Sequence, residues 1–335
     1  MNDKNNHEPK DGTCETDQSA SNRVVEGVGP ARAVERIIRP IRRRGDWPRE
    51  APVEDVEAGP TRLICVLDTE TTGLSTERHQ IIEICIAQVV VNEMGRIVAV
   101  PGMGSGLEDP GHPLSKEIVS LTGLTNADLA GQSIDRERLA AAIGECDGVV
   151  AFNSSFDRPF VEKLLPDLRK MPWGCAMKDV DWRAAGFERG PQNYLLMQTG
   201  YFNPFAHRAK DDVLSLIQLL DHVCDDGTSA MGKVLTTMSR PAWRFEACGA
   251  KFETKDVLRE QRYRWASASS QRVWHKHVPY GSFMAEYRWY RETIGQRPVV
   301  VPLPATERYR AEDSWTRTPG VVNRRALRGK PAPVF

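Results

Sequence analysis

Two acidic residues stand where an apolar run ends, in the segment LICVLDTETTG (63–73). Asp68 and Glu70 are two residues apart, and in a strand such residues project from the same face. Both carboxylates would then point to one spot beside buried apolar side chains, where charge is costly unless it is paired or bound to a cation. This segment contains no lysine or arginine to neutralise them. The pair predicts a cation site, whereas a single acid here could equally be an ordinary turn residue.

Two further acids and a histidine follow other predicted elements. In AFNSSFDRPF (151–160), Asp157 lies about one turn into a helix that follows a short strand; taken alone it could simply favour the helix dipole. In HRAKDD (207–212), His207 and Asp212 would be about 140° apart if both were helical. We therefore expect His207 at the entry to the last long helix, where it can reach a site that Asp212 faces. A surface histidine is the alternative.

These residue types favour one kind of chemistry. Four carboxylates and one histidine, with no thiol or second histidine nearby, suit Mg²⁺ or Mn²⁺ better than Zn²⁺ or Cu²⁺. Two such ions about 3.5–4 Å apart could clamp the attacking and leaving oxygens of a phosphodiester. A histidine, whose pKa is ordinarily near neutrality, could take a proton from water.

The elements that must position these residues follow from hydrophobic periodicity. Apolar runs at 62–68, 80–92 and 96–100 predict three strands of an antiparallel meander. Helical spacing follows at 115–123, 135–146, 155–165 and 206–223, with short strands at 148–153 and near 173–177. This order predicts an α/β domain with a mixed sheet over residues 61–224. Its self-contained pattern predicts that this segment folds alone.

Three motifs in order resemble those of one enzyme family. They are Asp68-Thr-Glu70-Thr-Thr-Gly73, Asn153-Ser-Ser-Phe156-Asp157-x-x-Phe160 and His207-x-Ala209-x-x-Asp212. The chain thereby resembles the DEDDh subgroup of DnaQ-like 3′–5′ exonucleases, which includes the proofreading epsilon subunit of bacterial DNA polymerase III. The resemblance implies an RNase H-like fold, a mixed five-stranded sheet flanked by helices, two divalent ions (Mg²⁺ or Mn²⁺) and release of nucleoside 5′-monophosphates.

The resemblance also assigns roles to residues. It makes Asp68, Glu70, Asp157 and Asp212 metal ligands and His207 the general base; Arg208 stands where the sister subgroup has tyrosine. The expected substrate contacts lie in and directly after the first motif, in the second motif and in the segment 115–129, for which a plain amphipathic helix is the alternative. These contacts are Thr71, Thr72, Gly73, Leu74, Glu117, Thr122, Asn153 and Phe156.

The rest of the chain falls into four segments. Residues 1–60 are polar and basic, and we expect a disordered, solvated arm. Residues 225–240 read as a linker with a short helix, and 296–335 as a basic, proline-containing tail that we expect to be disordered. Residues 241–295 form a small α+β module, with eleven of the 25 aromatic residues and ten basic against six acidic residues in 241–293. Such a mixture could stack on single strands, but a core role is favoured for Trp265 and Trp274.

Composition excludes several classes of protein. The 335 residues carry 45 basic and 45 acidic side chains, so the chain is not a uniformly basic nucleic-acid binder. No run approaches the roughly 20 apolar residues of a membrane span. The polar N-terminus lacks the apolar stretch of a signal peptide. The seven cysteines form no CxxC pair, which favours a reducing cytoplasm.

Together these observations predict a metal-dependent exonuclease acting on DNA 3′ ends in repair or proofreading, with a polymerase or repair protein as a possible partner. Trimming of RNA 3′ ends is the alternative substrate. A nucleic-acid-binding scaffold with a vestigial nuclease site is the alternative of another class.

Overall fold

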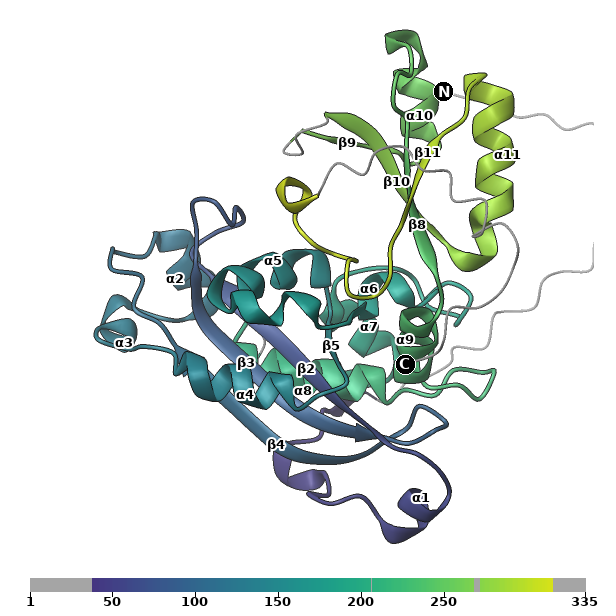
Figure 1. Cartoon of the computed structure of the whole chain (residues 1–335). Helices are drawn as coiled ribbons and strands as arrows, with labels where there is room; N and C mark the ends of the chain where they lie inside the picture. Colours follow the sequence, from purple (N-terminus) through teal and green to yellow (C-terminus); the bar gives the residue numbers. More distant parts are fainter. Residues whose placement is uncertain (1–37, 206, 268–271, 316–335) are drawn as a thin grey trace, which may run out of the picture. The chain divides into compact units, whose positions relative to one another are not determined.

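A mixed sheet organises the larger part of the chain. The computed structural model describes residues 38–205, 207–267 and 272–315. The sheet has the order β4-β3-β2-β5-β6 (Figure 1). Its strands are β2 (Arg62–Thr71), β3 (Ile81–Val91), β4 (Ile97–Leu107), β5 (Gly148–Ala151) and β6 (Trp173–Cys175). The first three strands pair antiparallel, and β5 and β6 continue in parallel. The predicted mixed, five-stranded sheet is confirmed.

Both faces of this sheet are covered, because the residues of β2 alternate between two cores. Ile64 and Val66 pack on one face with α7 (Gln192–Gln198), α8 (Ala209–Leu220) and α9 (Ala230–Ser239). Cys65 and Leu67 pack on the other face with α4 (Arg136–Gly144) and α5 (Ser154–Leu164). Shorter helices are α1 (Val53–Glu57), α2 (Lys116–Thr122), α3 (Asn126–Leu129) and α6 (Ala176–Asp179).

A second sheet lies in the segment predicted as an α+β module and extends past the expected end at residue 295. Its order is β11-β8-β10-β9, and its elements are β8 (Ala242–Glu246), α10 (Lys255–Glu260), β9 (Arg264–Ala266), β10 (Val273–Pro279), α11 (Phe283–Ile294) and β11 (Val299–Pro302). Phe245, Tyr263 and Tyr290 lie in its core, and Trp274 packs against that core. Trp265 is 47% exposed, so the core assignment was wrong for this residue.

The N-terminal arm was expected to extend to residue 60, but the described part of it is folded. β1 (Arg39–Pro40) pairs in parallel with β7 (Tyr201–Phe202). Trp47 is buried in the core shared with α8, and the Arg42 side chain donates to Gln218 and Asp221 on that side of the domain. Isolated contacts of this kind, made by one side chain at a time, produce no periodic pattern in a sequence. Residues 1–37 lie outside the described part.

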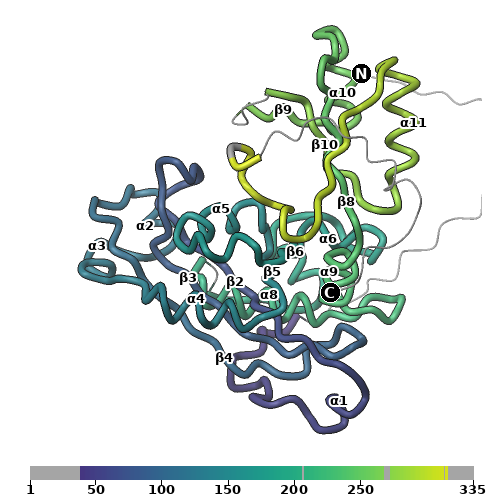
Figure 2. Tube along the Cα trace, viewed as in Figure 1, coloured from purple at the N-terminus to yellow at the C-terminus, as the bar shows by residue number. Residues whose placement is uncertain are grey.

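The C-terminal tail was expected to be disordered from residue 296, and this too is wrong for its described part. After β11 the chain runs back to the edge of the first sheet at β6 (Figure 2). The Trp173 N–H donates to the Ala305 carbonyl at 3.0 Å. The Arg158 side chain, fully buried on α5, donates to the carbonyls of Ala305, Thr306 and Arg308. Residues 316–335 lie outside the described part.

These contacts argue against the expectation that residues 61–224 fold alone. A chain truncated after Pro302 would keep the Glu162 carboxylate and the Arg169 carbonyl as partners of Arg158, but it would lose the three carbonyl acceptors at positions 305, 306 and 308. A hydrogen bond to a charged group is worth about 1.5–3 kcal/mol. We therefore expect the truncated chain to lose at least about 3 kcal/mol of unfolding free energy in urea. A chain truncated after Trp315 is the matched control, and equal midpoints for the two chains would contradict the prediction.

Within the described ranges, every helix is too short or too polar to cross a bilayer.

Candidate active site

Three of the predicted acids meet beside the end of β2. Asp68 and Glu70 extend from β2, and Asp212 extends from the first turn of α8. One carboxylate oxygen of each lies within 4.8 Å of the others. The reason is local: alternation places both β2 acids on the face that carries Ile64 and Val66, which is the face that α8 covers.

The fourth acid, Asp157, lies in the first turn of α5 and is 3% exposed. The Thr69 hydroxyl donates to its Oδ1 at 2.9 Å. Thr69 sits between Asp68 and Glu70 on β2, so its side chain faces the opposite side of the strand. The charge of Asp157 nevertheless raises the pKa of Asp68. The structure therefore places Asp157 near the three-acid cluster, but on the other side of β2.

Burial raises the pKa of all four acids. It raises the pKa of Asp68 well above its usual range, and the charges of Asp157, Asp212 and Glu70 add to the shift. The pKa of Glu70 rises to about 7, from burial and then the charge of Asp212. Burial likewise brings the pKa of Asp157 to about 7 and that of Asp212 to about 6. These carboxyl groups do not readily ionise together, because their negative charges repel. A divalent cation that prefers oxygen ligands, such as Mg²⁺ or Mn²⁺, would offset that repulsion.

His207 lies outside the helix, as expected, two residues before α8 begins. Its φ of 72° is in the left-handed region, which non-glycine residues rarely adopt. Its backbone N–H donates to Asp212 Oδ2 at 3.0 Å, and its side chain is exposed. The backbone bond ties the histidine to the acid cluster while the imidazole stays accessible to solvent.

Two residues of the site were missed from the sequence. Thr69 holds Asp157, as described above. Glu83 lies on β3 directly across from Glu70 and is buried at 2% exposure. The Arg208 side chain donates to both of its carboxylate oxygens, each at 3.0 Å. The available signal was an acid inside the apolar run IIEICIA, where a buried charge demands a partner.

The end of β2 and the loop that follows it hold four of the predicted substrate contacts. The Thr71 hydroxyl donates to the Gly73 carbonyl, and the Thr72 N–H donates to the Gln80 carbonyl, which closes the loop. A side chain at Gly73 would meet the His79 ring, since a Cβ there would lie 2.7 Å from it. Leu74 is 86% exposed. An apolar side chain left in solvent beside the acids is available to a ligand.

The other four predicted contacts differ in accessibility. Glu117 is exposed on α2, whereas Thr122 is buried and donates its hydroxyl to the Ile118 carbonyl. The Thr122 hydroxyl is thus engaged within α2. Asn153 precedes α5, and its Oδ1 is buried with no hydrogen-bond donor among the described residues. Phe156 packs against Phe160, with ring centroids 5.2 Å apart.

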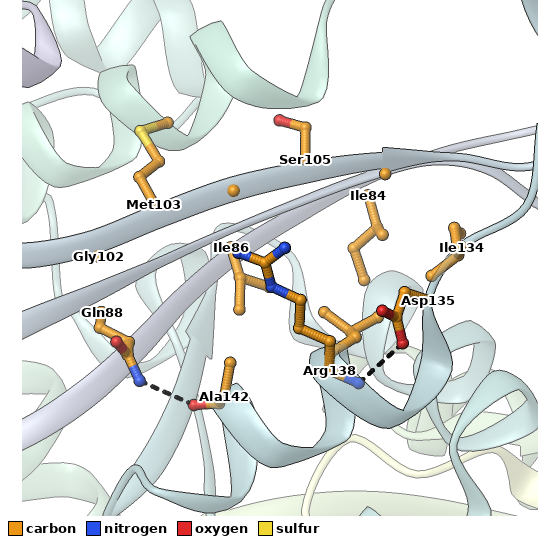
Figure 3. A pocket seen from close by; sticks show the side chains of 13 residues that line it. Ile84, Ile86, Gln88, Gly102, Met103, Ser105, Ile134, Asp135, Arg138 and Ala142 are labelled. Atoms are coloured by element: carbon orange, nitrogen blue, oxygen red, sulfur yellow. Dashed lines mark hydrogen bonds between the residues drawn. The ribbon is translucent and has the colours of Figure 1, made fainter.

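A cavity of about 390 Å³ lies away from these acids, between β3, β4 and α4 (Figure 3). It opens because Gly102, Gly104 and Gly106 alternate on β4 and leave one face of that strand without side chains. Ile84, Ile86 and Ile134 are among its apolar lining residues, and Arg138 extends along it from α4. None of the four predicted acids contributes to its lining.

Comparison with known proteins identifies the domain that carries the acids. The family model described as "Exonuclease" matches residues 65–220, which include all three motifs. Residues 65–220 are a DnaQ-like exonuclease domain. The predicted family is confirmed. The matched residues include most of the sheet and the helices α4, α5, α7 and α8, whereas α9 lies beyond them.

Part of the exonuclease domain is also similar to long bacterial polymerases. It is 36% identical over 100 residues to the PolC-type DNA polymerase III of Listeria monocytogenes, which is 29% of this chain and 6% of that protein. It is 37% identical over 118 residues to the PolC-type DNA polymerase III of Halalkalibacterium halodurans, which is 34% of this chain and 8% of that protein. The chain therefore covers only a small part of each polymerase.

Solved structures of exonucleases show weaker likeness. Exonuclease X in complex with 5′-overhanging duplex DNA is 24% identical, with a TM-score of 0.36, over 50% of this chain and 99% of that one. The Escherichia coli ExoI–single-stranded DNA complex is 14% identical, with a TM-score of 0.44, over 74% of this chain and 66% of that one.

Proposed function

We propose that this protein is a metal-dependent 3′–5′ exonuclease that removes nucleoside 5′-monophosphates from DNA ends. The observation that carries the proposal is the meeting of Asp68, Glu70 and Asp212 within 4.8 Å, with His207 tied to Asp212. Neighbouring carboxylates repel one another and destabilise the folded protein, which a binding scaffold without activity would not require. The match of residues 65–220 to the exonuclease family indicates the class of reaction.

The residues divide into two roles in this proposal. Asp68, Glu70, Asp157 and Asp212 would hold two divalent cations, Mg²⁺ or Mn²⁺, which when bound supply charge stabilisation for phosphodiester hydrolysis. The exposed imidazole of His207 would accept the proton of the attacking water, a role that histidine side chains commonly fill in enzymes. Its backbone bond to Asp212 keeps that imidazole next to the acids.

The terminal nucleotide would occupy the space beside the loop after β2. Leu74 offers an exposed apolar surface for the last base, and the backbone around Thr71 to Gly73 would face the sugar. The buried Asn153 Oδ1, which has no described donor, would accept a hydrogen bond from the nucleotide. Glu117, exposed on α2, would contact the same end.

DNA is the proposed substrate, and repair or proofreading the proposed setting, because the similar polymerases are named as DNA polymerases. A polymerase is accordingly the proposed partner. A cytoplasmic location is proposed because Cys65, Cys85, Cys146, Cys175 and Cys224 are buried as thiols, which a reducing compartment preserves.

The test uses single-stranded DNA, duplex DNA and RNA of one sequence, each labelled in turn at either end, with Mn²⁺. We expect mononucleotides from the 3′-labelled strand, a descending ladder from the 5′-labelled strand and no cleavage in EDTA. Faster digestion of RNA than of both DNAs would replace DNA by RNA as the substrate. An EDTA-resistant product, or none from any substrate, would overturn the proposed function.

A further inference from the structure

A buried glutamate outside the three motifs bonds to the two residues that follow the proposed base. Glu83 is the cross-strand partner of Glu70, and its side chain is 3% exposed. Two acids facing each other on neighbouring strands repel, and a buried carboxylate without partners is costly. A residue of this kind persists when a specific contact compensates for its charge.

The compensating contacts come from the start of α8. Arg208 donates its Nε to Glu83 Oε2 and its terminal nitrogen to Oε1, each at 3.0 Å, which is a two-pronged arginine–carboxylate pair. The Ala209 N–H also donates to Oε2 at 3.2 Å. Arg208 occupies the N-cap position of α8 and makes no side-chain capping bond there. Glu83 therefore caps a helix that belongs to another part of the chain.

His207 directly precedes the residues that Glu83 holds. It adopts a φ of 72°, and a non-glycine residue in that region persists only where the surrounding structure fixes its backbone. At His207 itself, the backbone is fixed by the hydrogen bond that its N–H donates to the Asp212 carboxylate. After His207, the backbone is held because the Arg208 side chain and the Ala209 N–H both donate to the Glu83 carboxylate.

We propose that Glu83 is a positioning residue, which acts through Arg208 to hold His207 in its place beside the acid cluster. Glu83 would not touch substrate. The inference rests on the proposed function, since it assigns Glu83 a role only if His207 is the base. Arginine is required rather than lysine, because a lysine cannot make two parallel bonds to one carboxylate.

The test compares four proteins: wild type, Glu83→Gln, His207→Ala and the double variant, assayed on a short single-stranded oligonucleotide. We expect Glu83→Gln to lower kcat by about 10–100-fold, the effect of displacing a reacting group by about 1 Å, with KM within about threefold. In the His207→Ala background the same change should lower kcat by less than about threefold, because the residue it positions is gone. Equal losses in the two backgrounds would overturn the proposal.

A second readout does not depend on activity. In metal-free protein, Glu83→Gln should speed hydrogen exchange of the His207 and Ala209 amides by at least about tenfold, since their local opening becomes easier. Amides in the middle of β3 should be unchanged. Unaltered exchange at both positions would overturn the proposal. If His207→Ala leaves kcat at the wild-type value, the base assignment itself fails, and this inference fails with it.

Two further variants guard against a trivial loss of folding. Arg208→Lys changes a side chain that is 44% exposed and keeps the positive charge. It should also lower kcat, and it should have little effect on kcat when it is combined with His207→Ala. Glu108→Gln is the matched control, because Glu108 likewise accepts an arginine, Arg136, and a backbone N–H, that of Ile134. Its kcat and the exchange at His207 should equal those of wild type. A similar kcat loss in Glu108→Gln would overturn the proposal.

Discussion

Asp68→Asn should lower kcat by at least about 10³-fold, because a bound cation contributes several kcal/mol of transition-state stabilisation and each 1.4 kcal/mol is tenfold in rate. The change keeps the side-chain volume and removes one carboxylate from the cluster with Glu70 and Asp212. Mononucleotide release from a labelled strand measures the loss. Asp211→Asn, one residue before Asp212 on α8 and outside the three-acid cluster, should cleave at the wild-type rate.

The same variant should change how stability responds to pH without metal. The pKa of Glu70 is raised to about 7 in the folded protein, and those of Asp157 and Asp212 to about 7 and about 6, from ordinary values near 4. The folded state therefore binds protons more tightly than the unfolded state. The stability linked to these acids is full below about pH 4 and is lost as the pH rises to about 7.

Removing one charge from the cluster weakens the mutual repulsion, so metal-free Asp68→Asn should lose less stability than wild type over that pH range. Its thermal midpoint at pH 7.5 should equal or exceed that of metal-free wild type. A lower midpoint, or more than a few per cent of wild-type cleavage, would contradict the role of Asp68 as a ligand.

His207→Ala should lower kcat by roughly 10²–10⁴-fold, the usual range for loss of a general base. Mn²⁺ affinity should hardly change, because the imidazole is not a member of the acid cluster and the backbone bond to Asp212 does not need it. Kinetics on a short oligonucleotide and calorimetric titration with Mn²⁺ measure the two effects separately.

An exposed histidine elsewhere provides the control for this variant. The His112 ring is hydrogen-bonded to the neighbouring Pro113 carbonyl and lies outside the three motifs, so His112→Ala should keep the wild-type kcat. If His207→Ala instead loses Mn²⁺ affinity in proportion to its loss of rate, the histidine is a ligand and the base assignment is wrong.

The sequence predicted those parts of the site that depend on local pattern. Alternation along β2 put Asp68 and Glu70 on one face, and helical spacing put Asp212 on the body of α8 with His207 before it. These features follow from a few neighbouring residues and a fixed repeat, so one short window of sequence suffices to predict them.

Contacts between distant residues could not be predicted in this way. Arg158 reads as an ordinary helix arginine in SFDRPF, yet it is fully buried against carbonyls about 150 positions later. Glu83 and Arg208 are 125 residues apart and bear no shared motif. Thr122 was expected at the substrate, but it is buried and its hydroxyl is bonded to the Ile118 carbonyl within its own helix. Side-chain bonds to remote backbone leave no period in the sequence.

The return of residues 303–310 to the edge of the exonuclease sheet has a consequence for synthesis of the protein. A domain that emerges from the ribosome from its N-terminus can complete its contacts only when its last member has been translated. All proposed catalytic residues precede position 213, but the buried Arg158, next to Asp157, meets its carbonyl partners only at 305–308. The nascent chain thus carries all four acids before the partners of Arg158 have been made, and we expect the segment around Asp157 to reach its full stability only after residues 305–308 have been translated.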